Sequence, residues 1–127
     1  MRFLCLICAE NVMEQLPKAD ADRHYEEYAA FTASIKASGH FVAANRLKPP
    51  GTATTVRVRG GKVLTTDGPF AETKEQFGGY YLIEAKDLTE AIEVASRSPG
   101  ARLGCVEVRP VADDPQTLAL GLDASRV

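Results

Sequence analysis

The sequence predicts an α+β domain in which an antiparallel sheet has both of its helices on one side. Strand-like and helix-like segments alternate along residues 2–111, and a pair of glycines separates two short alternating strands in mid-chain. With 127 residues, 45% hydrophobic and 25% charged, the chain fits one domain around one hydrophobic core.

The first half of the chain predicts a strand, a helix and a second strand. Residues 2–8 are apolar at both parities, which is typical of a strand buried on both faces. Asp20 or Asp22 is placed to cap a helix that runs to about Ser38. This helix carries an apolar stripe with i, i+3, i+4, i+7 spacing, made of Tyr28, Phe31, Thr32 and Ile35. Residues 41–47 are expected to form the second strand.

The rest of the domain predicts a hairpin, a strand, a helix and a last strand. Gly60-Gly61 separates the hairpin strands, because glycine supplies the positive φ of a two-residue turn. A buried strand at residues 80–83 precedes a helix that Asp87 caps and Pro99-Gly100 ends, and residues 106–111 form the last strand. This order is that of a ferredoxin-like, split βαβ sheet with an extra mid-chain β-hairpin.

Composition and charge argue against several classes of protein. The formal charge is -2 and the basic residues are scattered, so we expect no nucleic-acid partner. No apolar run approaches the roughly 18 residues that span a bilayer, and the run at residues 3–9 has no cleavage site after it, so we expect no membrane association and a cytoplasmic location.

The cysteines do not predict a metal site. Cys5 and Cys8 have C-x-x-C spacing, but side chains three apart in a strand point to opposite faces. Cys105 and the two histidines add no second pair with ligand spacing, so we expect no bound metal. We expect the three cysteines to be thiols.

The predicted sheet leaves one face uncovered. Two helices cover only one side, so Leu4, Leu6 and one of the pair Tyr80 and Tyr81 would lie in an exposed apolar patch. Such patches mark interfaces, and we therefore expect a homodimer, sheet against sheet. Residues 112–127 are a C-terminal extension, either a frayed tail or a segment docked on the partner subunit.

A charged loop follows the hairpin and opens with the motif Asp67-Gly68-Pro69-Phe70. Pro69 fixes φ and removes a backbone donor, and Phe70 is expected to anchor the loop to the core. Glu72 and Glu75, with Lys74 between them, bring further carboxylates close to Asp67. Such a cluster suits acid–base chemistry if it is partly buried.

Several other segments are as specific as this motif, and together they resemble the DGPF-domain proteins within the wider YCII-related superfamily. The resemblance covers residues 1–111 and implies a dimeric α+β barrel. The segments that carry it, besides residues 67–75, are Arg46-Leu47-Lys48-Pro49, Thr52-Ala53-Thr54-Thr55-Val56-Arg57, Gly79-Tyr80-Tyr81-Leu82-Ile83 and Glu107-Val108-Arg109-Pro110-Val111.

The resemblance implies two functions of different classes. Relatives are proposed to use a His on the first helix with an Asp near the sheet end, which implies a cofactor-free acid–base enzyme of isomerase or lyase type. Asp67 matches that Asp, and His24 or Tyr28 would stand opposite it. The alternative is a non-enzymatic regulatory or sensor module associated with an extracytoplasmic-function sigma factor, because such proteins are often encoded beside these factors.

The expected binding site for a small organic ligand is a cleft near Asp67. Arg57 shares a strand face with Arg59 and Thr55, which would line either a pocket for an anionic substrate or a solvated face at the rim of the dimer. The motif at residues 67–70 is either part of this site or a structural turn. The expected ligand-contacting residues are Gly68, Pro69, Phe70, Glu72, Lys74, Glu75 and Arg57.

Overall fold

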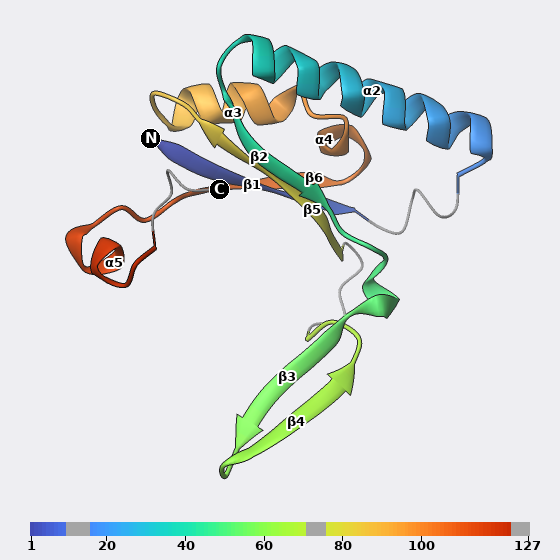
Figure 1. Ribbon diagram of the computed structural model, residues 1–127. Helices are drawn as coiled ribbons and strands as arrows, with labels where there is room; N and C mark the ends of the chain where they lie inside the picture. Colours follow the sequence, from blue (N-terminus) through green and yellow to red (C-terminus); the bar gives the residue numbers. More distant parts are fainter. Residues whose placement is uncertain (10–15, 71–75, 123–127) are drawn as a thin grey trace.

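A computed structural model describes residues 1–9, 16–70 and 76–122 (Figure 1). A four-stranded sheet has the order β2-β5-β1-β6, and β3 and β4 form a separate two-stranded sheet. The strands are β1 (Arg2–Ala9), β2 (Phe41–Arg46), β3 (Thr54–Arg59), β4 (Lys62–Asp67), β5 (Gln76–Glu84) and β6 (Cys105–Pro110). The helices are α2 (Lys18–Ala37), α3 (Leu88–Ser96), α4 (Gly100–Leu103) and α5 (Pro115–Ala119), and η1 (Pro50–Thr52) is a 3-10 turn.

Two βαβ units interlock in the main sheet. α2 joins β1 to β2, but β5 lies between these strands; α3 and α4 join β5 to β6, but β1 lies between them. All neighbouring strands are antiparallel. This arrangement confirms the predicted α+β class and the split βαβ element order. α2, α3 and α4 all lie on one side of the sheet (Figure 1).

The core fills the space between the sheet and these helices. Tyr81 lies at its edge, with its ring edge-on to Phe31 at 5.2 Å between centroids and its hydroxyl 2.7 Å from Thr32 Oγ1. The predicted helical stripe therefore faces the sheet. The largest fully buried side chains come from β1, α2, β5 and α3 and are Phe3, Ile35, Ile83 and Val94.

The opposite face of the sheet carries half-buried apolar side chains that none of α2, α3 and α4 covers. Register and alternation place these residues away from the core, as the sequence predicts. Glu107 and Arg109 of β6 share this face and form an ion pair at 2.6 Å. The apolar residues of this open face are Leu4 and Leu6 of β1, paired with Leu82 and Tyr80 of β5.

β3 and β4 form an arm, residues 54–67, that projects away from the main sheet (Figure 1). Gly60 and Gly61 have φ of 57° and 75°, which confirms the predicted two-residue turn. Thr55 is half-buried and the other residues of the arm are exposed. One face of the arm is apolar, with Val56, Val58 and Val63, and the other carries Arg57 and Arg59.

The predicted start of the first helix is wrong. α2 begins at Lys18 with Pro17 as its N-cap, and no side chain caps it. The ring of Pro17 fixes φ at -54°, a value close to the helical one, so the turn can begin before either aspartate. Asp20 instead pairs with Arg23 at 3.2 Å, and Asp22 lies exposed within the helix.

The second half of the domain follows the prediction with one difference. Asp87 caps α3 as expected, and its side chain accepts a hydrogen bond from the Glu90 backbone N–H at 2.9 Å. The helix ends at Ser96, and Pro99 is the N-cap of α4, where its missing N–H costs no hydrogen bond. Pro99 and Gly100 therefore begin a new helix and do not end α3.

The C-terminal extension contains α5. The Asp114 side chain accepts a hydrogen bond from the Thr117 backbone N–H at 3.0 Å, so part of the expected tail is a capped helical turn. Leu118, Leu120 and Leu122 are exposed. Docking of this segment on a partner stays a prediction. Within the described ranges, no helix has both the length and the apolar character that a membrane crossing requires.

Candidate functional site

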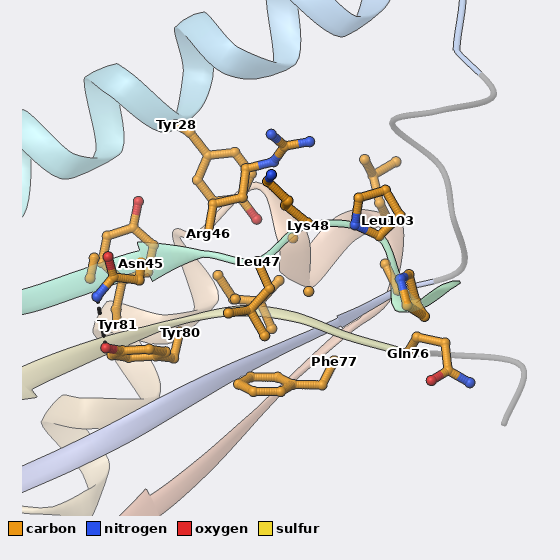
Figure 2. Close-up of a pocket in the computed structure, with 18 of the residues that line it drawn as sticks. Tyr28, Asn45, Arg46, Leu47, Lys48, Gln76, Phe77, Tyr80, Tyr81 and Leu103 are labelled. Atoms are coloured by element: carbon orange, nitrogen blue, oxygen red, sulfur yellow. Dashed lines mark hydrogen bonds between the residues drawn. The ribbon is translucent and has the colours of Figure 1, made fainter. Parts of the chain in front are cut away.

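A pocket of about 280 Å³ opens between α2 and the neighbouring strands β2 and β5, of which β2 is the edge strand (Figure 2). β1 and α4 contribute its remaining wall. Figure 2 shows Tyr28 on the α2 side of the strands, and Tyr80 and Phe77 on the opposite side. The lining residues are His24, Tyr25 and Tyr28 of α2, residues 44–50, residues 76–81, Ile7 and Ala9 of β1, and Gly100 and Leu103 of α4.

Aromatic rings form the wall under α2. His24 and Tyr28 lie one helical turn apart, on the same face of the helix. The two rings meet edge-to-face with their centroids 4.9 Å apart, and the Tyr28 ring lies parallel to that of Tyr81 at 6.4 Å. The 3.6-residue period thus places an imidazole and a phenol side by side in the pocket.

Two glycines allow close packing around the pocket. A Cβ atom at Gly100 would lie 2.5 Å from the Tyr28 hydroxyl oxygen and 2.7 Å from Ile7 Cγ2. A Cβ atom at Gly79 would lie 2.9 Å from the Asn45 carbonyl oxygen. Any side chain at Gly100 would therefore have to displace Tyr28.

The environment keeps the side chains of His24 and Tyr28 uncharged at neutral pH. Burial lowers the pKa of His24 from 6.5, Glu27 partly opposes this effect, and Arg102 reinforces it. Burial raises the pKa of Tyr28 above 10, and the nearby Ser98 hydroxyl partly offsets the rise. His24 is therefore a neutral imidazole that can accept a proton, and Tyr28 is a phenol that can donate a hydrogen bond.

Cationic side chains mark the β2 side of the pocket. Arg46 lies with its guanidinium 5.2 Å from the centroid of the Tyr25 ring, and Lys48 also lines the pocket. Asn45 donates a hydrogen bond to the Tyr80 hydroxyl at 2.8 Å, the dashed line in Figure 2. No aspartate or glutamate is among the described residues that line the pocket. The lining thus favours an anion.

A family model of the YCII-related domain matches residues 1–114. The chain belongs to the YCII-related family. It is also similar to a protein of Rhizobium meliloti (strain 1021) described as uncharacterized, with 36% identity over 105 residues, 81% of this chain and 85% of that protein. The resemblance to the YCII-related superfamily is confirmed, and the narrower DGPF assignment stays a prediction.

The predicted site residues of this YCII-related domain fall into two groups. His24 and Tyr28 lie together in the pocket, but Asp67 is not one of its lining residues. Asp67 ends β4 at the base of the arm, where it is exposed and pairs with Thr54. The structure therefore does not place Asp67 opposite His24 across one cleft.

The residues after Asp67 form a turn that closes the base of the arm. Gly68 has φ of 96°, its N–H donates to the Ala53 carbonyl at 2.7 Å, and its own carbonyl accepts from Thr55 Oγ1 at 2.8 Å. These bonds give the glycine of the motif a structural use, because a positive φ strains other residues.

Those other predicted contact residues that the structure describes are also absent from the pocket lining. Phe70 is 83% exposed, so the predicted anchoring to the core is wrong. Pro69 is exposed, and Arg57 lies on the exposed arm. Glu72, Lys74 and Glu75 are outside the described residues.

Sequence reasoning missed the cations and amides of the pocket. Arg46 and Lys48 belong to a segment that carries the family resemblance, but only their pairing with α2 in space makes them site residues. Two cations at the end of a strand, directly before Pro49 and Pro50, were the available signal. Asn45 and Gln76 gave none, since no motif or periodicity in the sequence marks either amide.

Proposed function

We propose that this YCII-related protein binds a small aromatic or cyclic organic anion in the pocket beneath α2. One observation carries the proposal: the described lining combines aromatic rings and two cations with no carboxylate. The rings of Tyr28 and Tyr81 offer a stacking surface, and Arg46 and Lys48 offer charge-assisted hydrogen bonds to a carboxylate or phenolate. The volume, about 280 Å³, lies at the small end of ligand pockets and favours a ligand with one ring.

The proposal extends to proton transfer without a cofactor. Neutral His24 accepts a proton from a carbon next to a carbonyl or carboxylate of the bound molecule. Tyr28, whose hydroxyl stays protonated, donates a hydrogen bond to the oxygen on which negative charge develops. This pairing supports an isomerase or lyase type of reaction and gives Asp67 no part in it.

Binding is tested by thermal unfolding with benzoates, phenolates and cyclic lactone acids. A ligand at 100 times its Kd stabilises the folded protein by ~2.7 kcal/mol, a readily measured shift in Tm. We expect an aromatic acid to raise Tm and its neutral amide analogue to have little effect. The double variant Arg46→Gln/Lys48→Gln should lose the shift.

The matched control removes two cations from the arm. Arg59→Gln/Lys62→Gln makes the same change in net charge, but neither residue lines the pocket. It should keep the full shift. If no acid shifts the wild type, or if both double variants respond alike, the pocket is not an anion site.

Chemistry is tested separately from binding. With a ligand from the screen in D₂O, deuterium incorporation at its acidic carbon reports proton abstraction. His24→Gln should abolish the exchange while the Tm shift persists, and Tyr28→Phe should slow it. Binding without any exchange by the wild type would favour the alternative of a ligand sensor over the enzyme.

We also propose that the protein is a homodimer joined through the open face of the sheet. Half-buried Leu4, Leu6 and Leu82 on this face support an apolar interface. A second copy there would also enclose the side of the pocket that holds Tyr80 and Phe77. Two such sheets, face to face, would form the barrel expected for the family.

Sedimentation of the wild type over a range of concentrations tests the dimer. Leu6→Glu should shift the protein to monomers, because it would bury a charge in the interface. Ala29→Glu, on the exposed side of α2, is the control and should remain dimeric. A wild type that sediments as a monomer at high concentration contradicts the proposal.

A further inference from the structure

Two cysteines face each other across β1 and β6. The register pairs Cys8 with Cys105, and no bulge interrupts these two strands. Directly opposed residues of antiparallel strands point to the same face, with Cα atoms about 4.5–5.5 Å apart. This separation lies inside the roughly 4.4–6.8 Å range of Cα distances in disulfides. The fold thus creates a dithiol that the cysteine spacing in the sequence does not predict.

The backbone beside this pair is packed closely. A Cβ atom at Gly104 would collide with the Cys8 carbonyl oxygen and would lie 2.9 Å from the Ala9 Cα atom. The lack of a side chain at Gly104 therefore lets the start of β6 lie against the end of β1. Both cysteines lie on the open face of the sheet, where Cys8 is half-buried and Cys105 is exposed, so a small oxidant can reach the pair in the monomeric chain.

The third cysteine is separated from this chemistry. Cys5 is buried among the core residues, on the face of β1 opposite to Cys8. Burial also raises the pKa of the Cys5 thiol to about 11, which leaves little of the reactive thiolate at neutral pH. Cys5 therefore serves as an internal control.

We propose that Cys8 and Cys105 are a redox-active dithiol that a hydroperoxide converts to an intramolecular disulfide and a thiol reductant restores. The Cys105 thiolate attacks the O–O bond of the hydroperoxide, takes one oxygen as sulfenic acid and releases water or an alcohol. The Cys8 thiolate then attacks that sulfur and expels the oxygen as water. The two thiols lose two electrons and two protons in total, and the hydroperoxide gains them.

The disulfide between Cys8 and Cys105 would lie next to residues of the pocket wall. Ile7 and Ala9, on either side of Cys8 in the chain, line the pocket, and so does Leu103. A bond between positions 8 and 105 also closes most of the chain into one loop, which restricts the unfolded state. Oxidation should therefore raise the unfolding midpoint in urea and fasten β1 to the segment that follows α4.

The test uses the reduced, folded full-length chain at low concentration, with hydrogen peroxide as the oxidant. The variant Cys5→Ala keeps the pair and removes the only other cysteine. We expect its intact mass to fall by two hydrogen atoms, a peptide map to join Cys8 to Cys105, and dithiothreitol to reverse both changes. The unfolding midpoint should rise on oxidation and return on reduction.

A single cysteine variant and the chemical product of peroxide oxidation distinguish the proposed disulfide from other oxidation products. Cys105→Ser, at an exposed position, should show no such mass loss and no change in midpoint with peroxide. Oxidation of the Cys5→Ala protein only to sulfinic acid, or only to disulfides between chains, would overturn the proposal. So would an unchanged pair of thiols after peroxide has oxidised the same chain unfolded in urea.

Discussion

The main sheet with its helices and the β3–β4 arm differ most in what their apolar side chains contact. Phe3 and Ile83 of the sheet are fully buried, whereas Val56, Val58 and Val63 of the arm are 61%, 58% and 68% exposed. A two-stranded hairpin has no second layer and gains little stability from its apolar face in isolation. The sheet and helices therefore supply most of the free energy of folding, and the apolar face of the arm stays exposed.

The candidate chemical groups and the most distinctive sequence motif also lie in different regions of the molecule. His24 and Tyr28 lie in the pocket of the main body, while Asp67 and Gly68 close the base of the arm. A motif that stands out in the sequence can thus be there to make a turn. The polar groups suited to chemistry come from a regular helix, where nothing in the local sequence distinguishes them.

The largest difference should appear between two phenylalanines, one in each region. Phe3→Ala removes a fully buried ring and should lower the free energy of unfolding by about 3–5 kcal/mol. Phe70→Ala removes a ring that is 83% exposed and should change it by no more than about 0.5 kcal/mol. Urea denaturation of both variants, at a concentration where the chain is monomeric, measures the contrast.

A large loss for Phe70→Ala under those conditions would mean that the base of the arm packs on the body. A loss that appears only as the protein concentration rises would instead place Phe70 in an interface between copies.

A smaller effect should distinguish two glycines. Gly100→Ala puts a methyl group against the Tyr28 hydroxyl and Ile7 and should destabilise the fold by about 1–3 kcal/mol. Gly51→Ala, in η1, meets nothing within 4 Å and should be neutral or stabilising by roughly 0.4–1 kcal/mol. Thermal unfolding gives both values. Equal effects at the two sites would show that Tyr28 moves aside easily and that the pocket wall is soft.

The smallest effect concerns acid stability. Because the pKa of His24 is lower in the folded chain than its ordinary 6.5, the unfolded chain binds more protons once the pH falls below that value. The free energy of unfolding should therefore decrease as the pH falls through 6.5 toward the folded pKa. His24→Gln should show a shallower decrease in urea titrations between pH 7.5 and pH 5.

The control is His40→Gln, directly before β2, where His40 contacts Ser38 and Glu90. This variant should keep the acid dependence that His24 causes. If His24→Gln follows the wild-type curve, burial of His24 does not disfavour its protonated form.

Much of the fold was predictable because turns and helix caps depend on only a few neighbouring residues. The positive φ at Gly60 and Gly61 fixed the hairpin, and the Asp87 carboxylate fixed the start of α3. The prediction failed at Asp20 and Phe70. Each has a residue type suited to its expected role, but Pro17 starts the helix earlier and the turn at Gly68 directs the chain away from the core.

The sequence by itself determined the family, the α+β class, the order of the elements and the helical face that carries His24 and Tyr28. Only the tertiary structure decided that Arg46 meets this face, that Asp67 does not, and that Cys8 lies opposite Cys105. Periodicity, caps and turns act over a few residues and can be recognised in one segment. The pocket and the cysteine pair depend on strand register between segments far apart in the chain, and packing of the whole core sets that register.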